Sequence, residues 1–121
     1  MKYAMLYDNG KLLDRVQIAN TFLERLRGLM FQRNIKEGLL LCPCSQIHTY
    51  FMREPIDVVY LDRSGQVLSV ETAMEPRKIG WYIHGSYCVL ELPAHRWSQY
   101  QCGNTIEVRR QEEMAYVQVL G

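Results

Sequence analysis

The sequence predicts a mainly β domain, α+β at most, folded as a compact β-sandwich or partly closed barrel of seven or eight short strands with one short helix. Three observations indicate this class. Short runs rich in β-branched and aromatic residues recur along the chain, turn signals separate them regularly, and one helix-capping pattern is present. Short strands separated by turns are typical of sandwiches and barrels.

The first two strands are predicted from the dipeptide Asn9-Gly10. It lies between two β-prone segments, residues 3–8 and 11–18. Both positions of a tight hairpin turn require positive φ, which asparagine and glycine tolerate best. The two segments are therefore expected to form a β-hairpin.

A short helix is predicted near residues 21–28. Thr21 and Glu24 form a capping box, in which the threonine accepts a hydrogen bond from a backbone N–H three residues on and the glutamate reaches back. Gly28 can end the helix. Apolar residues at helical spacing support the assignment: Phe22, Leu23, Leu26, Leu29 and Met30.

The remaining elements are predicted from apolar runs and the residues that bound them. Residues 39–41 are expected to form a short buried strand, residues 56–61 and 66–71 a second hairpin, and residues 72–85 a long loop. The further elements expected are a strand over 87–92 that Pro93 stops, a turn or short helix over 94–100, and strands over 105–110 and 115–120.

Composition limits the classes of function. A chain of 121 residues is one domain, residues 1–121, and is long enough to bury a core. Its 48% hydrophobic and 22% charged residues are typical of a soluble globular protein. The 14 basic residues nearly cancel the 13 acidic ones, which argues against a nucleic-acid partner or an anionic membrane.

Localisation is predicted from the lack of targeting signals in the sequence. Asp8 interrupts the first apolar segment too early for a signal peptide, and no run approaches the roughly 18 apolar residues of a membrane span. We therefore expect a cytoplasmic protein. In that compartment its four cysteines, Cys42, Cys44, Cys88 and Cys102, should mostly be reduced thiols.

Four motifs carry a family resemblance. They are Arg25-x-x-Gly28-Leu29-Met30-Phe31, Gly38-Leu39-Leu40, Met52-Arg53-x-Pro55-Ile56-Asp57-Val58-Val59-Tyr60-Leu61-Asp62 and Val89-Leu90-Glu91-Leu92-Pro93. In this order, over roughly residues 15–108, they resemble the domain-of-unknown-function 192 family, a bacterial and archaeal group of small domains. The resemblance implies a β-rich, sandwich-like fold with one conspicuous helix, and it implies no activity.

Residues 42–57 gather most of the side chains that could carry chemistry. Cys42, Cys44 and His48 supply two thiolates and an imidazole, a weak candidate set for zinc if Cys88 or Cys102 came near. Their spacing differs from the Cys-x-x-Cys knuckle, and free cysteines often pack as small apolar residues. No other cofactor is expected.

The same stretch offers candidates for ligand binding. A polar and aromatic pocket could be lined by His48, Arg53, Asp57 and Glu91, with Tyr50, Trp81 and Tyr82 nearby. Arginine can bind a carboxylate or phosphate with two parallel hydrogen bonds. For Arg53 and Asp57 the alternative is a structural ion pair or a loop clamp, because a charge in an apolar run must be exposed or paired. Glu91 is expected on the solvent face or paired with an arginine, since strand alternation places it opposite its apolar neighbours.

We therefore expect a non-enzymatic binding or accessory domain with a small-molecule or peptide site near residues 42–57, and assign no catalytic residue. The sequence has no paired-carboxylate, Gly-rich phosphate or Ser-His-Asp signature. The alternative is a metal-dependent or cysteine-dependent enzyme that uses Cys42, Cys44 and His48. A third possibility is a structural protein whose exposed strand edge pairs with a partner. The partner is expected to be a small molecule or a protein, and the oligomeric state stays open.

Overall fold

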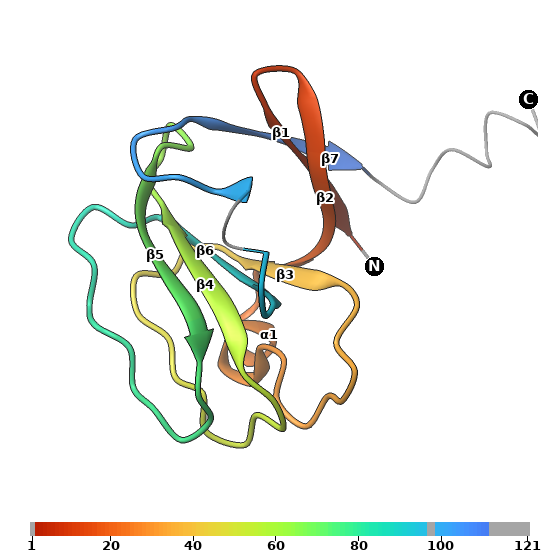
Figure 1. Ribbon diagram of the computed structural model, residues 1–121, viewed down its shortest axis with the longest axis vertical. Coiled ribbons are helices and arrows are strands. Elements are labelled where there is room, and N and C mark those ends of the chain that lie inside the picture. The colour runs from red at the N-terminus through yellow and green to blue at the C-terminus, as the bar shows by residue number, and fades with distance from the viewer. Residues whose placement is uncertain (1, 97–98, 112–121) are drawn as a thin grey trace, which may run out of the picture.

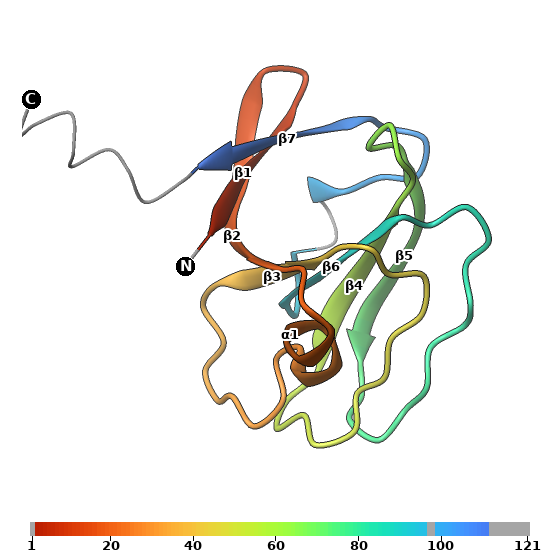
Figure 2. The same cartoon turned by 180° about the vertical axis from the view of Figure 1, so that it is seen from behind.

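The computed structural model describes residues 2–96 and 99–111, and this part of the chain is mostly β, with one seven-stranded sheet and one short helix (Figures 1 and 2). The elements are β1 (Tyr3–Asp8), β2 (Lys11–Ala19), α1 (Phe22–Arg27), β3 (Gly38–Leu41), β4 (Ile56–Leu61), β5 (Val67–Met74), β6 (Cys88–Pro93) and β7 (Ile106–Gln111). The strand order across the sheet is β5-β4-β6-β3-β2-β1-β7. The predicted mainly β class is confirmed.

Neighbouring strands pair antiparallel, except that β2 and β3 run parallel and are connected through α1. The predicted hairpin between β1 and β2 is confirmed. Asn9 and Gly10 take φ angles of 51° and 82°, the positive values that a tight hairpin turn requires. The second predicted hairpin, β4 with β5, is also present.

The sheet is not closed, but its two margins meet at one end. The N–H of Val67 donates to the carbonyl of Asn104 at 2.8 Å, and the N–H of Ile106 donates to the carbonyl of Gly65 at 2.8 Å. A Cβ atom on Gly65 would lie 2.2 Å from the backbone carbonyl oxygen of Ile106, so only glycine allows the two segments to approach this closely. The result is a partly closed barrel.

Helix α1 begins as the capping box predicts. Thr21 Oγ1 accepts from the N–H of Glu24 at 3.2 Å, and Glu24 Oε1 accepts from the N–H of Thr21 at 3.1 Å. The apolar residues of the helix are not core, however: Phe22, Leu23 and Leu26 are 70%, 72% and 53% exposed. Within the described residues, α1 included, no helix has the length and hydropathy to cross a membrane.

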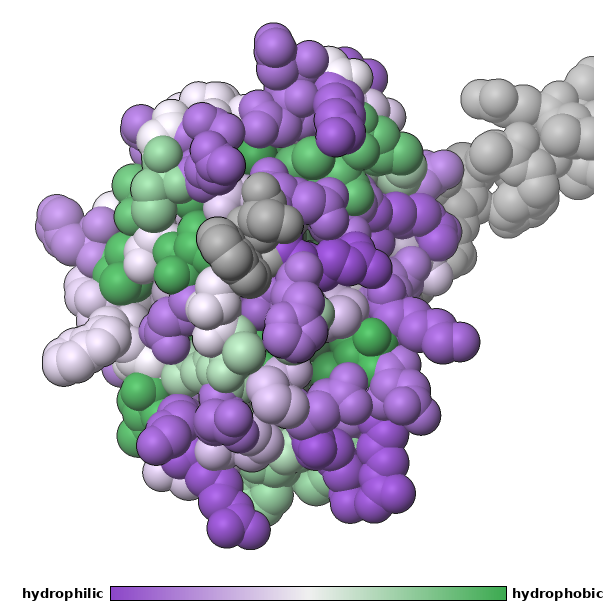
Figure 3. All heavy atoms as spheres, in the orientation of Figure 1, coloured by the Kyte–Doolittle hydropathy of each residue, from purple (hydrophilic) through white to green (hydrophobic). Residues whose placement is uncertain are grey.

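Helix α1 lies on the side of the sheet that faces the viewer in Figure 2. The opposite face, shown in Figure 3, is mostly hydrophilic, with hydrophobic side chains in several separate areas.

The central strands are buried on both faces. One core cluster, which includes Leu90 and Leu92, draws on β1, β2, β3, β4, β5, β6 and β7 and fills the inside of the curved sheet. A second cluster includes Leu39 and Val58 and lies on the other face, where Leu29 and the loop segments between β3 and β4 cover it. Strand β4, buried along its whole length, contributes to both clusters.

Some element boundaries differ from the sequence prediction. Strand β5 continues to Met74, where a loop was expected, because Ile56 still pairs with Met74 beyond an irregularity at which Ala73 takes a φ of 48°. The turn expected over 94–100 is described only in part, since residues 97–98 lie outside the described residues. The strand expected over 115–120 also lies outside them.

The prediction that the cysteines are mostly reduced thiols is wrong for Cys42 and Cys88, which form a disulfide; Cys44 and Cys102 are free. The cause is the antiparallel pairing of β3 with β6. Leu41 lies opposite Val89. Because the strands are antiparallel, Cys42, which follows Leu41, lies opposite Cys88, which precedes Val89, and their Cα atoms are 4.6 Å apart. This contact joins residues 46 positions apart in the chain.

Candidate functional site

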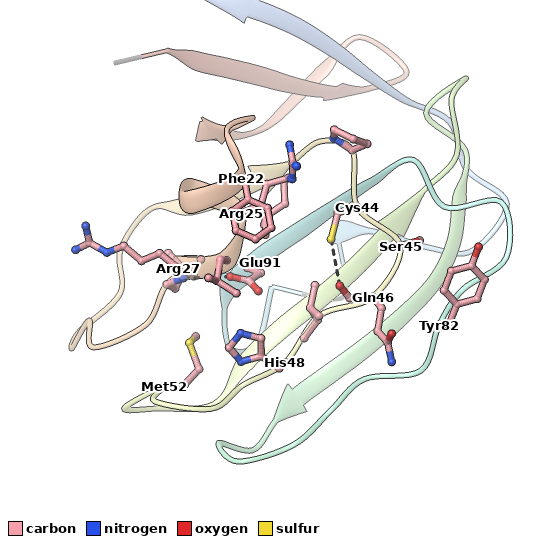
Figure 4. Close-up of a pocket in the computed structure, with 16 residues that line it drawn as sticks. Phe22, Arg25, Arg27, Cys44, Ser45, Gln46, His48, Met52, Tyr82 and Glu91 are labelled. Carbon is pink, nitrogen blue, oxygen red and sulfur yellow. Dashed lines mark hydrogen bonds between the residues drawn. The ribbon is translucent and has the colours of Figure 1, made fainter.

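A hollow of about 440 Å³ lies between the C-terminal end of α1 and the loop over residues 43–48. Figure 4 shows the side chains of Cys44, His48 and Glu91 directed into it. Its apolar and aromatic rim includes Phe22, Leu26 and Tyr82, all of them exposed. The other lining residues are Arg25, Arg27, Gly28, Leu29, Leu41, Pro43, Ser45, Gln46, Ile47 and Met52.

Glu91 forms the floor of this hollow. It lies on β6, between its ladder partners Leu39 of β3 and Val58 of β4, and only 3% of its surface is exposed. Its Oε1 accepts a hydrogen bond from the backbone N–H of Leu29 at 3.2 Å. That N–H is the one donor to the carboxyl within residues 2–96 and 99–111, and no cationic side chain there pairs with it.

The end of α1 fits against Glu91 because residue 28 is glycine. Gly28 has a φ of +51°, and a Cβ atom there would lie 2.7 Å from Glu91 Oε1. The N–H of Gly28 donates to the carbonyl of Glu24 at 3.0 Å, which ends the helix. The chain then turns so that the next N–H, that of Leu29, donates to the carboxyl.

The electrostatic consequence is a carboxyl that holds its proton unusually well. Burial raises the pKa of Glu91 to about 7, against the opposing effect of the hydrogen bond from Leu29. Near neutral pH both forms of Glu91 are therefore populated. The ionised form carries a buried negative charge with a single hydrogen bond, which is costly without a further donor.

Cys44 lies on the side of the hollow opposite α1. Its N–H donates to the carbonyl of Tyr87 at 2.8 Å, and its Sγ lies 3.3 Å from the carbonyl of Gln46. Burial raises the pKa of the thiol, and the nearby Glu91 charge acts in the same direction. The thiol is thus less acidic than a free cysteine, the reverse of what an activated nucleophile needs.

His48 is half-buried and also lines the hollow. Its Nδ1 accepts from the N–H of Tyr50 at 3.2 Å, so in the neutral ring the proton is on Nε2. The rings of His48 and Tyr50 are 6.0 Å apart between centroids.

Tyr50 and Arg53 lie in a second hollow of about 370 Å³, next to the first. Phe31 and Phe51 line it with their rings 5.6 Å apart, and both side chains are exposed. Met52 lines both hollows, so its side chain separates them. The structure thus distributes His48 and Arg53 to two adjacent hollows.

Asp57 lies apart from both hollows. It is fully buried, and its carboxylate accepts from the backbone N–H groups of Ala73 and Arg96. Its partner across the ladder is Leu92, which packs in the core cluster on the face opposite Glu91. Of the two alternatives given for Asp57, this geometry matches the loop clamp: the side chain fixes two segments that are distant in sequence.

The candidate zinc set is not assembled. Cys42 is bonded to Cys88 and offers no thiolate, while Cys44 and His48 line the hollow. Over the described ranges 2–96 and 99–111, no three side chains from His, Cys, Asp and Glu are grouped so that they could hold a metal ion.

The sequence named Glu91 as a possible pocket residue, but its expected position was wrong: within the described residues it is neither on the solvent face nor paired with an arginine. Alternation correctly places it opposite Leu90 and Leu92, but that opposite face carries the second core cluster. The available signal was a lone charge within an apolar run, together with Gly28 just after the predicted helix.

Comparison with known sequences gives one family and several relatives. The family model DUF192, "Uncharacterized ACR, COG1430", matches residues 5–109. UPF0127 protein TK1120 of Thermococcus kodakarensis is 38% identical over 80 residues, which cover 57% of this chain and 51% of that protein. A UPF0127 protein of Thermococcus sibiricus is 40% identical over 65 residues, 49% of this chain and 42% of its own. The chain thus spans about half the length of these relatives.

Two solved structures have a similar fold. A protein of unknown function from Novosphingobium aromaticivorans superposes with a TM-score of 0.74 at 16% identity, over 87% of this chain and 83% of that one. A structure from Sinorhizobium meliloti superposes with a TM-score of 0.76 at 20% identity, over 89% and 94%. At these identities the likeness is one of fold.

Proposed function

Because this chain belongs to the DUF192 family, which is described without an activity, we propose from its geometry that it is a non-enzymatic binding or accessory domain. The match over residues 5–109 confirms the resemblance predicted over residues 15–108. The proposed site is the hollow between α1 and residues 43–48, and the proposed ligand is a small molecule or a peptide segment.

The observation that supports this most directly is the Glu91 carboxyl. A concave, largely apolar site with a few convergent polar groups is typical of ligand pockets. Here a buried carboxyl with one backbone donor forms the floor, and a ligand that adds a donor would relieve the cost of its burial. His48, at the side of the hollow, provides a further polar contact.

A peptide ligand could extend into the second hollow. Tyr50 and Arg53 lie there, on the far side of Met52. An extended chain crossing Met52 would present one side chain to Glu91 and place a carboxylate or an aromatic ring near Arg53 and Tyr50. This arrangement includes the predicted ligand-binding residues His48, Tyr50 and Arg53, and leaves Asp57 as a structural clamp.

The alternative of a cysteine-dependent enzyme has less support. Cys42 is bonded to Cys88, and the pKa of the Cys44 thiol is raised by burial, so little thiolate forms near neutral pH. Catalysis by Cys44 would require a nearby cation to lower that pKa. Arg25 acts in this direction, but its effect is smaller than that of burial.

Two matched variants test the proposed site. In both Gln46 and Gln66 the side chain is exposed and its Nε2 lies within hydrogen-bonding distance of a glycine carbonyl: Gly80 at 2.9 Å for Gln46, and Gly103 at 3.5 Å for Gln66. Gln46 lines the hollow and Gln66 does not. Tryptophan at 46 should block the hollow, whereas tryptophan at 66 should change only the remote surface.

The measurement is a titration of the ¹⁵N-labelled protein with cationic, anionic and neutral aromatic fragments and with tetrapeptides. Binding in the hollow should shift the backbone N–H signals of Leu29 and Cys44, and Gln46→Trp should abolish these shifts while Gln66→Trp keeps them. If no fragment or peptide shifts these signals, or if Gln46→Trp binds as the wild type does, the proposed site is wrong.

The disulfide also bears on localisation. Disulfides persist in oxidising compartments and are rare in the cytoplasm, so the Cys42–Cys88 bond supports an oxidising compartment over the predicted cytoplasmic one. Acid quenching of cells followed by alkylation of thiols tests this. Alkylation of two cysteines, Cys44 and Cys102, would support the oxidising compartment, whereas alkylation of all four would support the predicted cytoplasmic localisation.

A further inference from the structure

The charge environment of Glu91 restricts what the hollow can bind. Helix α1 contributes two guanidinium groups near the rim, the loop over 43–48 contributes a thiol and an imidazole, and strand β4 contributes a buried phenol. Around Glu91 the titratable and charged groups are Arg25, Arg27, Cys44, His48, Tyr60 and, at the rim, Tyr82; Glu71 of β5 lies on the same face of the sheet, beyond Val58. Across the described ranges, none of them forms an ion pair with the carboxyl.

The two arginines are directed elsewhere. Arg25 donates to the backbone carbonyl of Asn20 at 2.8 Å. Figure 4 shows the guanidinium groups of Arg25 and Arg27 pointing away from the carboxyl of Glu91. In the part of the chain that the structure describes, a carboxyl thus lies at the floor of a hollow and no cationic side chain pairs with it.

Resting on the proposed function, we propose that the ligand carries a protonated primary amine, which donates hydrogen bonds to the Glu91 carboxylate. An ammonium group is compact and has three donors, so it can reach the floor of the hollow and replace the water that ionised Glu91 would otherwise require. Charge-assisted hydrogen bonds of this kind are stronger than neutral ones.

The body attached to the amine is expected to be apolar or aromatic. Phe22, Leu26 and Tyr82 lie at the rim with most of their surface exposed. Aromatic and aliphatic groups gain free energy when they cover such surface. A free arylalkylamine, an amino-terminal aromatic residue and a lysine side chain beside an apolar residue all share this chemistry.

The competing ligand chemistry is a carboxylate. It would need Glu91 in its protonated form, so its affinity would fall as the pH rises. An alkylamine, which stays protonated up to pH 8, needs the ionised form, so its affinity should rise with pH. With the pKa of Glu91 at about 7, the gain for an amine between pH 6 and pH 8 should be roughly tenfold. The two chemistries are thus distinguished by the sign of the pH dependence.

The test compares three probes of one shape by isothermal titration calorimetry at pH 6, 7 and 8. They are phenethylamine, 2-phenylethanol and phenylacetate. Phenethylamine should bind most tightly at pH 8, at least about tenfold tighter than 2-phenylethanol, and should lose affinity roughly tenfold at pH 6. Glu91→Gln should remove both the preference for phenethylamine over 2-phenylethanol and the pH dependence of binding, while its amide oxygen can still accept from the N–H of Leu29. The control is Glu75→Gln, which changes an exposed glutamate outside the hollow and should alter neither.

The binding data distinguish a failure of this inference, in which the hollow binds ligands but does not prefer an amine, from a failure of the proposed function, in which the hollow binds no ligand. Equal binding of phenethylamine and 2-phenylethanol, or tighter binding of phenylacetate at low pH, would overturn the amine while Gln46→Trp still abolished binding. If Glu91→Gln did not fold, the wild-type profiles would decide: affinity that rises with pH for phenethylamine and not for 2-phenylethanol supports the amine, and any other pattern overturns it.

The source of the amine is distinguished by two further probes. Phenylalanine amide presents an amino-terminal group, and Nα-acetyl-lysine methylamide presents a lysine side chain. If one of these probes binds more tightly than the other, and N-acetylation of its amine abolishes the binding, that probe identifies the source of the amine. If binding survives acetylation, the inference is wrong.

Discussion

The backbone of Gly28 lies directly against the carboxyl of Glu91: a Cβ atom on this glycine would lie 2.7 Å from Oε1. This contact is what positions the N–H of Leu29 to donate to the carboxyl, and it joins the end of α1 to the centre of the sheet.

Gly28→Ala should lower the free energy of unfolding by roughly 1–3 kcal/mol, because alanine at a φ of +51° is strained and its Cβ would collide with Glu91. Gly10→Ala is the matched control, since Gly10 also has positive φ, +82°, but no atom within 4 Å of a Cβ there. Urea denaturation of both variants measures the difference. Equal losses would show that the approach to Glu91 contributes nothing beyond backbone strain.

Stability should depend on pH through Glu91. The carboxyl has a folded-state pKa of about 7 against an ordinary value of 4.5, so the folded state binds its proton more tightly than the unfolded state does. The free energy of unfolding should therefore fall as the pH rises from about 4.5 through 7, by roughly 3 kcal/mol from this residue.

The measurement is urea denaturation of the wild type and of Glu91→Gln between pH 4.5 and pH 8. The variant has no proton to lose, so its stability relative to the wild type should increase with pH. Glu75→Gln should follow the wild type throughout. Parallel curves for the wild type and Glu91→Gln would contradict a raised pKa.

Removal of the Cys42–Cys88 bond should lower the free energy of unfolding by about 4 kcal/mol, the chain-entropy cost expected for residues separated by 46 positions. Thermal or urea denaturation with and without reductant measures it, and Cys42→Ala with Cys88→Ala should reproduce the reduced protein. Cys102→Ser, a change at an exposed free thiol, should leave the effect of reductant intact. Insensitivity to reductant would mean that the bond is absent.

Asp57→Asn should destabilise the fold by about 2 kcal/mol or more, because a buried carboxylate that accepts from the N–H groups of Ala73 and Arg96 is replaced by a neutral amide. Asp62→Asn is the control: Asp62 also accepts from backbone N–H groups, those of Ser64 and Gln66, but at an exposed turn, and its loss of stability should be clearly smaller than that of Asp57→Asn. Denaturation measures both. An Asp57→Asn variant of unchanged stability with altered ligand affinity would place Asp57 in the site instead.

The parts of the fold that the sequence could predict are those decided by neighbouring residues. The Asn9-Gly10 turn and the Thr21 capping box depend only on the chemistry of a few consecutive positions, and both were predicted with their residues. The exposure of α1 was not, because helical spacing of apolar residues does not say whether a partner covers them.

The parts that could not be predicted depend on the order of strands in the sheet. Whether Glu91 faces solvent or a second core depends on β6 lying between β4 and β3, which no local pattern specifies. The disulfide has the same origin, since only the β3–β6 pairing brings Cys42 to Cys88. Of the predicted stretch 42–57, residues 43–48 and Met52 line the hollow, and Glu91, named from the sequence as a possible pocket residue, lies at its floor; the wall formed by α1 was not predicted.

The pairing of β1 with β7 has a consequence for how this chain can be made. Tyr3 lies opposite Gln111 and Asp8 opposite Ile106, so the outer edge of β1 is satisfied by one of the last described segments to be synthesised. As the chain leaves the ribosome, the β1–β2 hairpin can form early, but about 90 further residues must be synthesised before β7 covers its exposed edge. During that interval the nascent chain offers an open strand to any other strand nearby, and a chaperone that shields residues 3–8 would raise the yield of folded protein.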